Sequence, residues 1–293
     1  MIRELIVNMN NNFIIRTITG LTFVVIVVGC ILWHPISYGI LFAIFSGATT
    51  WEFCSLMNKY QGCQINRMIT TVASVYLFGA IMAFNANITG SEIFIPYLIT
   101  LVYLLIVELY FPKNNVLTNW AFTMMSQLYI ALPFALLNTL SFISVNNGVI
   151  YNPVFVLSVF IFIWFGDSAA YGFGTWLGRH RLFPRISPKK SWEGCIAAFV
   201  MAIGVSQVIA SFNQSFTSED LPNRLAWAGL AIVVIGFGTW GDLVESQIKR
   251  KLGIKDSGKI LPGHGGMLDR FDSSLLAIPM AVVYIYTMNE IFV

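Results

Sequence analysis

The chain has 293 residues, of which 57% are hydrophobic and only 11% are charged, and its mean hydropathy is +0.73. Because an ordinary soluble domain carries roughly 25% charged residues, this composition excludes a water-soluble globular protein. The formal net charge is +3, and the basic residues are unevenly distributed, with five in 179–190 and six in 249–270. These two segments are the first places to look for chemistry.

Nine apolar segments follow one another along the chain, each long enough to cross a hydrocarbon core ~30 Å thick. Strands are not expected in them, because alternation of period two is absent and an open sheet edge cannot be satisfied in lipid. We predict an all-α, polytopic transmembrane helix bundle that forms a single integral membrane domain over 1–293. Its N-terminal helices would occupy 1–150, and the polar segments lie in 151–293. The predicted spans are 14–33, 36–57, 68–84, 93–111, 120–143, 153–176, 194–212, 224–241 and 273–292.

The short loops predict the orientation, because Lys and Arg are retained on the cytoplasmic side of a membrane. With a cytoplasmic N-terminus, the loops near His34 and at 85–92, 144–152 and 213–223 lie outside and contain no Lys or Arg. Both basic segments then lie inside, next to helices whose ends are polar. The sequence therefore predicts a functional site at the cytoplasmic border.

The predicted span 153–176 ends in a polar stretch that contains Asp167. A carboxylate at membrane depth is costly and requires a partner or a cation. Ala170, Gly174 and Gly178 place a small residue at every fourth position, which is typical of close helix packing in lipid. The string Gly172-Phe-Gly174 does not indicate a dinucleotide loop, because the next glycine is one position late and no strand precedes it.

The first basic segment continues into the run 187–194, Ser-Pro-Lys-Lys-Ser-Trp-Glu-Gly. One interpretation is a positive-inside loop with a proline turn, followed by a helix whose N-terminal dipole favours Glu193. The other is a phosphate-binding segment. The residues alone leave both open.

The second basic segment begins on a helix, where Asp242, Glu245, Ser246 and Lys249 are spaced i, i+3, i+4 and i+7 and so share one face. This face meets either solvent at the helix end or a polar cavity. A glycine-rich basic loop follows and ends in an acidic stretch, 269–272. Glycines let backbone N–H groups approach a phosphate, basic side chains neutralise it, and carboxylates can hold a bridging divalent ion.

Three runs in this segment carry a resemblance. They are Ser246-Gln-Ile-Lys249-Arg250, Lys255-Asp256-Ser-Gly258 and Pro262-Gly-His264-Gly265-Gly266-Met-Leu-Asp269-Arg270-Phe-Asp272. Together they resemble the signature of the phosphatidate cytidylyltransferase (CDP-diacylglycerol synthase) family without a gap. The Asp-x3-Tyr element at Asp167 and the run 187–194 are similar to the same family, with Ser191 where threonine is more usual. The N-terminal half resembles the family only as a series of apolar helices.

The resemblance implies an enzyme that transfers CMP from CTP to phosphatidate, forming CDP-diacylglycerol and pyrophosphate for phospholipid biosynthesis. It implies Mg²⁺ as the cofactor, together with a monovalent cation such as K⁺. Asp242 and Asp269 would be the principal Mg²⁺ ligands, with Asp167 and Asp272 as further members of the acidic cluster. The residues assigned to catalysis are Lys249, Arg250, Asp242 and Asp269. Those assigned to substrate binding are Ser187, Lys189, Lys190, Ser191, Ser246, His264, Gly265, Gly266 and Arg270.

The implied partners are CTP, phosphatidate and the lipid bilayer, with no nucleic acid, and a homodimer is compatible with the sequence. The implied location is the bacterial inner (cytoplasmic) membrane, with the active site facing the cytoplasm. One alternative is a CTP-dependent polyprenol or dolichol kinase-like enzyme. Another is a secondary transporter, in which Glu52, Glu108 and Asp167 would relay protons and inverted repeats are expected. Outside the transporter alternative, capping, interhelical hydrogen bonding and a position near the membrane interface all stay open for Glu52 and Glu108.

Overall fold

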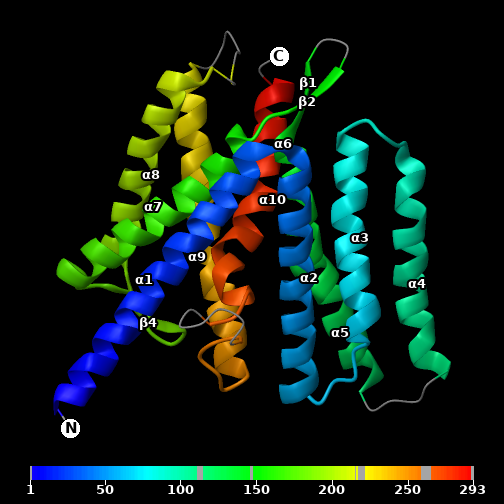
Figure 1. The fold of residues 1–293 in the computed structure, drawn as a ribbon, viewed down its shortest axis with the longest axis horizontal. Coiled ribbons are helices and arrows are strands. Elements are labelled where there is room, and N and C mark those ends of the chain that lie inside the picture. Colours follow the sequence, from blue (N-terminus) through cyan, green and yellow to red (C-terminus); the bar gives the residue numbers. More distant parts are fainter. Residues whose placement is uncertain are drawn as a thin grey trace. The chain divides into compact units, whose positions relative to one another are not determined.

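The structure is a computed structural model, and it describes residues 2–110, 115–145, 148–214, 216, 222–258 and 265–291. Helices dominate it (Figure 1). In chain order they are α1 (Ile2–Trp33), α2 (Pro35–Tyr60), α3 (Arg67–Asn85), the short 3₁₀ helix η1 (Ser91–Phe94), α4 (Ile95–Tyr110), α5 (Val116–Ser126), the π-helical turn η2 (Gln127–Ala131), α6 (Leu132–Ser141), α7 (Val154–Trp176), α8 (Trp192–Phe212), α9 (Asn223–Lys251) and α10 (Leu268–Ile291).

The predicted membrane spans are confirmed as helices. Within the described residues, 8 helical segments are long and apolar enough to cross a membrane, and α1 adds the shorter apolar segment Ile18–Trp33. These segments follow the order of the nine predicted spans. The span predicted over 120–143 is interrupted by η2, and its predicted end overlaps a strand. The span predicted over 224–241 belongs to a helix that continues to Lys251, so the polar face beyond Asp242 is helical as expected.

Two short antiparallel hairpins lie in connecting segments, where the sequence analysis did not anticipate strands. β1 (Phe142–Val145) pairs with β2 (Gly148–Tyr151), and β3 (Arg181–Phe183) pairs with β4 (Ser187–Ser191). The second hairpin matters for the site, because β4 contains the Ser-Pro-Lys-Lys-Ser run and leads directly into α8. The loop interpretation of this run is therefore corrected to a strand.

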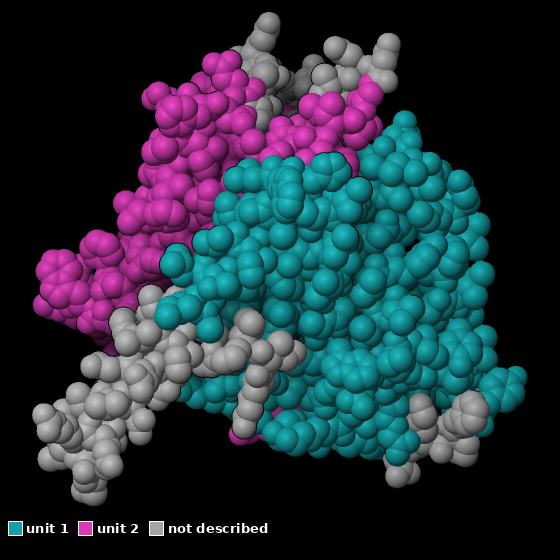
Figure 2. Space-filling view, in the orientation of Figure 1, with its two compact units in different colours: residues 1–135, 254–271 teal, residues 136–253, 272–293 magenta. Residues whose placement is uncertain are grey.

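The chain divides into two compact units (Figure 2). Unit 1 comprises 1–135 and 254–271, and unit 2 comprises 136–253 and 272–293. The prediction of one integral membrane domain over 1–293, with a catalytic part from residue 151, stays a prediction.

Aromatic side chains fill the interior of unit 1. The Phe271 ring lies 5.2 Å from that of Phe45 and 4.9 Å from that of Phe134, between ring centroids. Buried hydroxyl groups in the same unit are hydrogen-bonded to one another, with the Ser46 and Ser74 Oγ atoms 2.7 Å apart between α2 and α3. Phe271 thus fixes the first turn of α10 to the N-terminal helices of this unit.

Unit 2 is built on α7, α8 and α9, which pack successively against each other. Trp227 on α9 is fully buried and stacks on Phe155 of α7, with ring centroids 5.4 Å apart. The hydroxyl of Tyr284 on α10 donates a hydrogen bond to the Ala226 carbonyl at 2.9 Å. These contacts fix the end of unit 2 that is remote from the polar ends of α7 and α9.

Candidate active site

A cavity of about 330 Å³ opens in unit 2 among α7, α8, α9 and β4. Much of its wall is apolar and comes from the three helices. Its charged and hydroxyl lining includes five residues that the sequence analysis had assigned to the site: Asp167, Lys189, Lys190, Ser191 and Asp242. Segments that are far apart in the sequence are therefore brought to one cavity.

Small residues set the approach of α7 to α8 beside this cavity. A Cβ atom added at Gly194 would lie 2.7 Å from the Ala170 carbonyl oxygen and 3.2 Å from the Gly174 Cα. A Cβ atom added at Gly178 would lie 2.7 Å from the Ser191 Oγ. The prediction of close packing from the row of small residues is confirmed. This close approach holds the end of β4 against the polar end of α7.

The end of the basic run has a structural role as well as a place in the cavity. Ser191 is buried and caps α8 by accepting a hydrogen bond from the Gly194 N–H at 3.2 Å. Glu193 lies in the first turn of α8, where it accepts from the His180 N–H at 3.1 Å and contacts His180 Nδ1 at 2.7 Å. The Ser191 cap and the Glu193 carboxylate fix the position of β4, the strand that presents Lys189 and Lys190 to the cavity.

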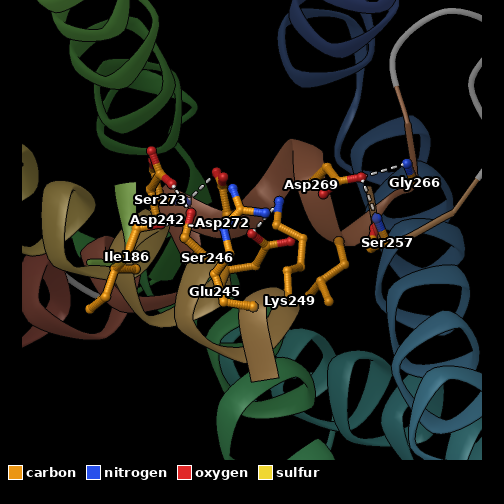
Figure 3. A network of polar contacts seen from close by, with 12 residues as sticks. Ile186, Asp242, Glu245, Ser246, Lys249, Ser257, Gly266, Asp269, Asp272 and Ser273 are labelled. Atoms are coloured by element: carbon orange, nitrogen blue, oxygen red, sulfur yellow. Dashed lines mark hydrogen bonds and ion pairs between the residues drawn. The ribbon is translucent and has the colours of Figure 1, made fainter. Parts of the chain in front are cut away.

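Asp242 and Lys190 form an ion pair in the cavity wall. The Lys190 Nζ lies 2.5 Å from Asp242 Oδ2, and the two side chains are 28% and 26% exposed. The Ser246 hydroxyl donates to Asp242 Oδ1 at 3.1 Å (Figure 3). The cavity thus holds a carboxylate that could exchange its ammonium partner for a cation. It also holds an ammonium that could exchange its carboxylate partner for an anion.

The polar face of α9 continues from Asp242 toward the C-terminal end of the helix. Lys249 Nζ lies 2.5 Å from Glu245 Oε2, and the Glu245 side chain is fully buried (Figure 3). The two contacts 242–246 and 245–249 confirm that the four predicted residues share one face. The complete burial of Glu245 favours the polar-cavity interpretation over a solvated helix end. Arg250 is exposed, and its Nε donates to the Ile186 carbonyl at 3.4 Å, which ties the end of α9 to the turn before β4.

Asp272 belongs to the same unit. Its Oδ1 accepts a hydrogen bond from the Ser273 N–H at 2.6 Å, and the carboxylate lies within electrostatic range of Asp242, Asp167 and Lys249. Three of the four acidic residues predicted to hold a cation therefore occur in unit 2, near one another and near basic side chains.

Asp269 lies in unit 1, in the first turn of α10. Its Oδ2 accepts hydrogen bonds from the Ser257 N–H at 2.9 Å and the Gly266 N–H at 2.8 Å (Figure 3). Gly265 has a φ of +83°, a left-handed conformation that glycine adopts without steric cost. The carboxylate is thus oriented by the backbone on both sides of the glycine-rich loop.

A model of the cytidylyltransferase family matches residues 14–288. The chain belongs to the cytidylyltransferase family. It is 36% identical to a phosphatidate cytidylyltransferase of Staphylococcus haemolyticus over 201 residues, which cover 68% of this chain and 72% of the relative. Relatives of the same name from Staphylococcus saprophyticus and Staphylococcus epidermidis are 40% and 43% identical over 162 and 127 residues. These two alignments cover 55% and 43% of this chain, and 56% and 46% of those relatives.

The other assigned residues of this cytidylyltransferase that the structure describes lie outside the cavity lining. Ser187 is half-buried on β4 opposite Phe183, and Arg270 is exposed. Gly266 is buried, and His264 lies outside the described residues. Because Asp242 and Asp269 belong to different units, the prediction that they share a cation stays a prediction.

Two buried carboxylates of the cytidylyltransferase, whose role the sequence left open, have hydrogen-bond partners in the structure. Glu52 on α2 is buried and accepts hydrogen bonds from the Met267 and Leu268 N–H groups at 2.9 and 3.2 Å. Glu108 is also buried and accepts from the Asn119 side-chain amide at 3.0 Å. In the sequence, each of these residues is a carboxylate in an apolar segment. Such a residue requires a polar partner, but the sequence does not identify the partner.

The donor set fits Mg²⁺ in chemical type, because the acidic cluster of unit 2 offers carboxylate oxygens, the ligands preferred by hard cations. No group of three or more His, Cys, Asp or Glu side chains suited to a metal ion occurs among the residues that the structure describes. Mg²⁺ commonly uses one or two protein carboxylates and completes its shell with phosphate oxygens and water. A small set of aspartates beside a cavity lined by lysines is compatible with that requirement.

Proposed function

We propose that this cytidylyltransferase transfers CMP from CTP to phosphatidate, in the cavity of unit 2. A phosphate oxygen of phosphatidate attacks the α-phosphorus of CTP, the bond to the β-phosphate oxygen breaks, and pyrophosphate leaves. The observation that carries this proposal is the convergence of Lys189, Lys190, Asp167 and Asp242 on one cavity with apolar walls. The relatives named phosphatidate cytidylyltransferase support the same substrates.

The reaction places few demands on proton transfer. A phosphate monoester has a second pKa of about 6, so the phosphatidate headgroup is largely ionised near neutral pH and no general base is needed. Two polyanions must instead be aligned, and charge on the triphosphate must be neutralised. Basic side chains on a fixed strand and helix suit that task.

The ion pair between Lys190 and Asp242 suggests how the cavity accepts its substrates. When a phosphate group enters, the Lys190 ammonium turns to the phosphate oxygens and remains charge-paired. Asp242 is then available to a cation, while Ser246 still donates a hydrogen bond to it. Lys189 lines the same cavity, and Lys249 and Arg250 supply further positive charge along α9.

Asp242 and Asp269 would be the principal residues holding Mg²⁺, with Asp167 and Asp272 as further ligands. When bound, Mg²⁺ neutralises charge on the triphosphate and on the leaving pyrophosphate. A monovalent cation such as K⁺ would add to the same effect. The aspartates themselves do not transfer protons in this scheme.

The apolar wall of the cavity suits a substrate that stays in the membrane. Phosphatidate would enter laterally between helices, and CTP would arrive from water at the polar ends of α7 and α9. The distribution of Lys and Arg supports a cytoplasmic active site in a bacterial inner membrane. A homodimer stays a prediction.

The test is conversion of radiolabelled CTP and phosphatidate by the purified protein, with and without Mg²⁺. We expect CDP-diacylglycerol and pyrophosphate in equal amounts, and none when the metal is chelated. Formation of a lipid phosphate with CDP from a polyprenol would instead indicate a kinase-like enzyme. A protein that produces no CDP-lipid under any metal condition would refute the proposal.

A further inference from the structure

The buried carboxylate of Glu52 contacts two segments of unit 1, 257–258 and 266–268. We call them the flanking segments, because they lie on either side of the glycine-rich loop in the sequence. Its Oε2 accepts from the Met267 N–H at 2.9 Å, and its Oε1 accepts from the Leu268 N–H at 3.2 Å and from the Ser257 hydroxyl. The side chain is 6% exposed. A residue of α2 therefore receives three hydrogen bonds from a part of the chain about 200 positions away.

The glycines of the flanking segments make room for this carboxylate. A Cβ atom added at Gly258 would lie 2.6 Å from Glu52 Oε2 and 3.2 Å from the Gly266 Cα. A Cβ atom added at Gly266 would collide with Glu52 and with the Ser257 hydroxyl. The two flanking segments thus approach each other closely at Gly258 and Gly266, and Glu52 lies against both.

Glu52 and Asp269 accept hydrogen bonds from the same two segments, but from different donor atoms. Glu52 binds the Ser257 hydroxyl, whereas Asp269 binds the Ser257 N–H. Glu52 binds the Met267 N–H, whereas Asp269 binds the neighbouring Gly266 N–H. The donors that orient Asp269 are therefore held in place by Glu52.

We propose that Glu52 is a positioning residue of the transferase reaction: by holding Ser257, Met267 and Leu268, it fixes the backbone donors that orient the Asp269 carboxylate. The negative charge of Glu52 also lies at the N-terminus of α10, where the helix dipole favours it. This inference rests on the proposed function, because it gives Asp269 a role in the reaction. Glu52 itself touches neither substrate nor reacting atoms.

The carboxylate cannot be replaced by its amide without a conflict. In Glu52→Gln, one acceptor oxygen becomes an NH₂ donor. If the amide nitrogen takes the Oε2 position, it faces the Met267 N–H, and if it takes the Oε1 position, it faces the Leu268 N–H. Either orientation places a donor against a buried donor, so the flanking segments must shift.

Glu108→Gln is the matched control. Glu108 is a second glutamate of unit 1 with the same 6% exposure, and it accepts a hydrogen bond from the Asn119 side-chain amide. Both variants remove one buried charge from the same unit. Only Glu52→Gln should disturb the residues around Asp269.

The experiment measures two properties of the full-length purified protein. Hydrogen–deuterium exchange should increase at the amides of Ser257, Gly266, Met267 and Leu268 in Glu52→Gln and stay unchanged there in Glu108→Gln. In the CTP assay, kcat of Glu52→Gln should fall about 10- to 100-fold, as for other residues that orient a ligand. The Mg²⁺ concentration for half-maximal rate should rise, and KM for phosphatidate should change little.

Unchanged exchange at these amides in Glu52→Gln, or a kcat within about threefold of the wild-type value, would overturn the proposal. Equal losses in both variants, in proportion to their folded fractions, would also overturn it and leave Glu52 a purely structural residue. If the wild-type protein makes no CDP-diacylglycerol, the proposed function fails. The exchange measurement then still decides whether Glu52 holds the segments around Asp269.

Discussion

The ion pair between Glu245 and Lys249 allows structural and chemical roles to be separated. Glu245 is fully buried and Lys249 is 12% exposed, with 2.5 Å between their charged atoms. Lys249→Met keeps the length of the side chain but removes the ammonium that faces the buried Glu245 carboxylate. Removing one partner of a buried pair costs about 3–5 kcal/mol. Because the ammonium retains some access to solvent, we expect the lower end, about 3 kcal/mol.

The double variant Glu245→Leu/Lys249→Met replaces both charges by apolar groups of similar size. Such a replacement is often neutral or stabilising, so the double variant should be more stable than Lys249→Met alone. The assay is the free energy of unfolding of the purified protein in detergent, from denaturant titration followed by circular dichroism. The four proteins form a double-mutant cycle, which isolates the interaction between the two side chains.

Activity should respond differently from stability in this cycle. Because Lys249 is proposed to supply positive charge for the substrate phosphates, CDP-diacylglycerol formation should stay low in the double variant even when stability returns. Recovery of activity together with stability would show that Lys249 acts only as the partner of Glu245. If Lys249→Met lowered the free energy of unfolding by less than about 1 kcal/mol, the argument from the burial of Glu245 would be refuted.

Further substitutions test single steps of the same reasoning. Asp269→Asn should abolish CDP-diacylglycerol formation at a stability cost below about 1 kcal/mol, because the amide oxygen can still accept both backbone hydrogen bonds; near-wild-type activity with labelled CTP would remove the assignment. Asp242→Asn should lower kcat at least about 100-fold while the protein still folds, as checked by gel filtration and turnover. Ser191→Ala should cost about 1 kcal/mol of unfolding free energy through loss of the α8 cap, and an unchanged denaturation midpoint would contradict this. Gly194→Ala should destabilise the protein by about 1–3 kcal/mol, because its methyl group would meet the α7 backbone, which thermal unfolding measures directly.

Features with a local cause were predictable from the sequence. The length of the apolar segments predicted the spans, and the spacing of 242, 245, 246 and 249 predicted one helical face. The row of small residues Ala170, Gly174 and Gly178 predicted close packing. The hairpin of β3 and β4 was not predicted, because its strands are short and lie in a charged segment without alternation. The partner of Asp242 was also not predictable, since Lys189 and Lys190 are adjacent in the sequence and only the register of β4 decides which one reaches it.

The carboxylates of this charge-poor chain can be distinguished by their partners. Asp242 is paired with a lysine in an open cavity, and an incoming phosphate can take over that lysine while a cation takes its place at the carboxylate. Glu52 is bonded to backbone N–H groups and a hydroxyl at a buried site, and these donors would lose their partners if the carboxylate moved. The first arrangement can exchange during a catalytic cycle, whereas the second is stable only if it stays fixed. Sequence identifies both residues as acidic, and the partner type underlies the two proposals, an exchangeable cation ligand at Asp242 and a fixed positioning residue at Glu52.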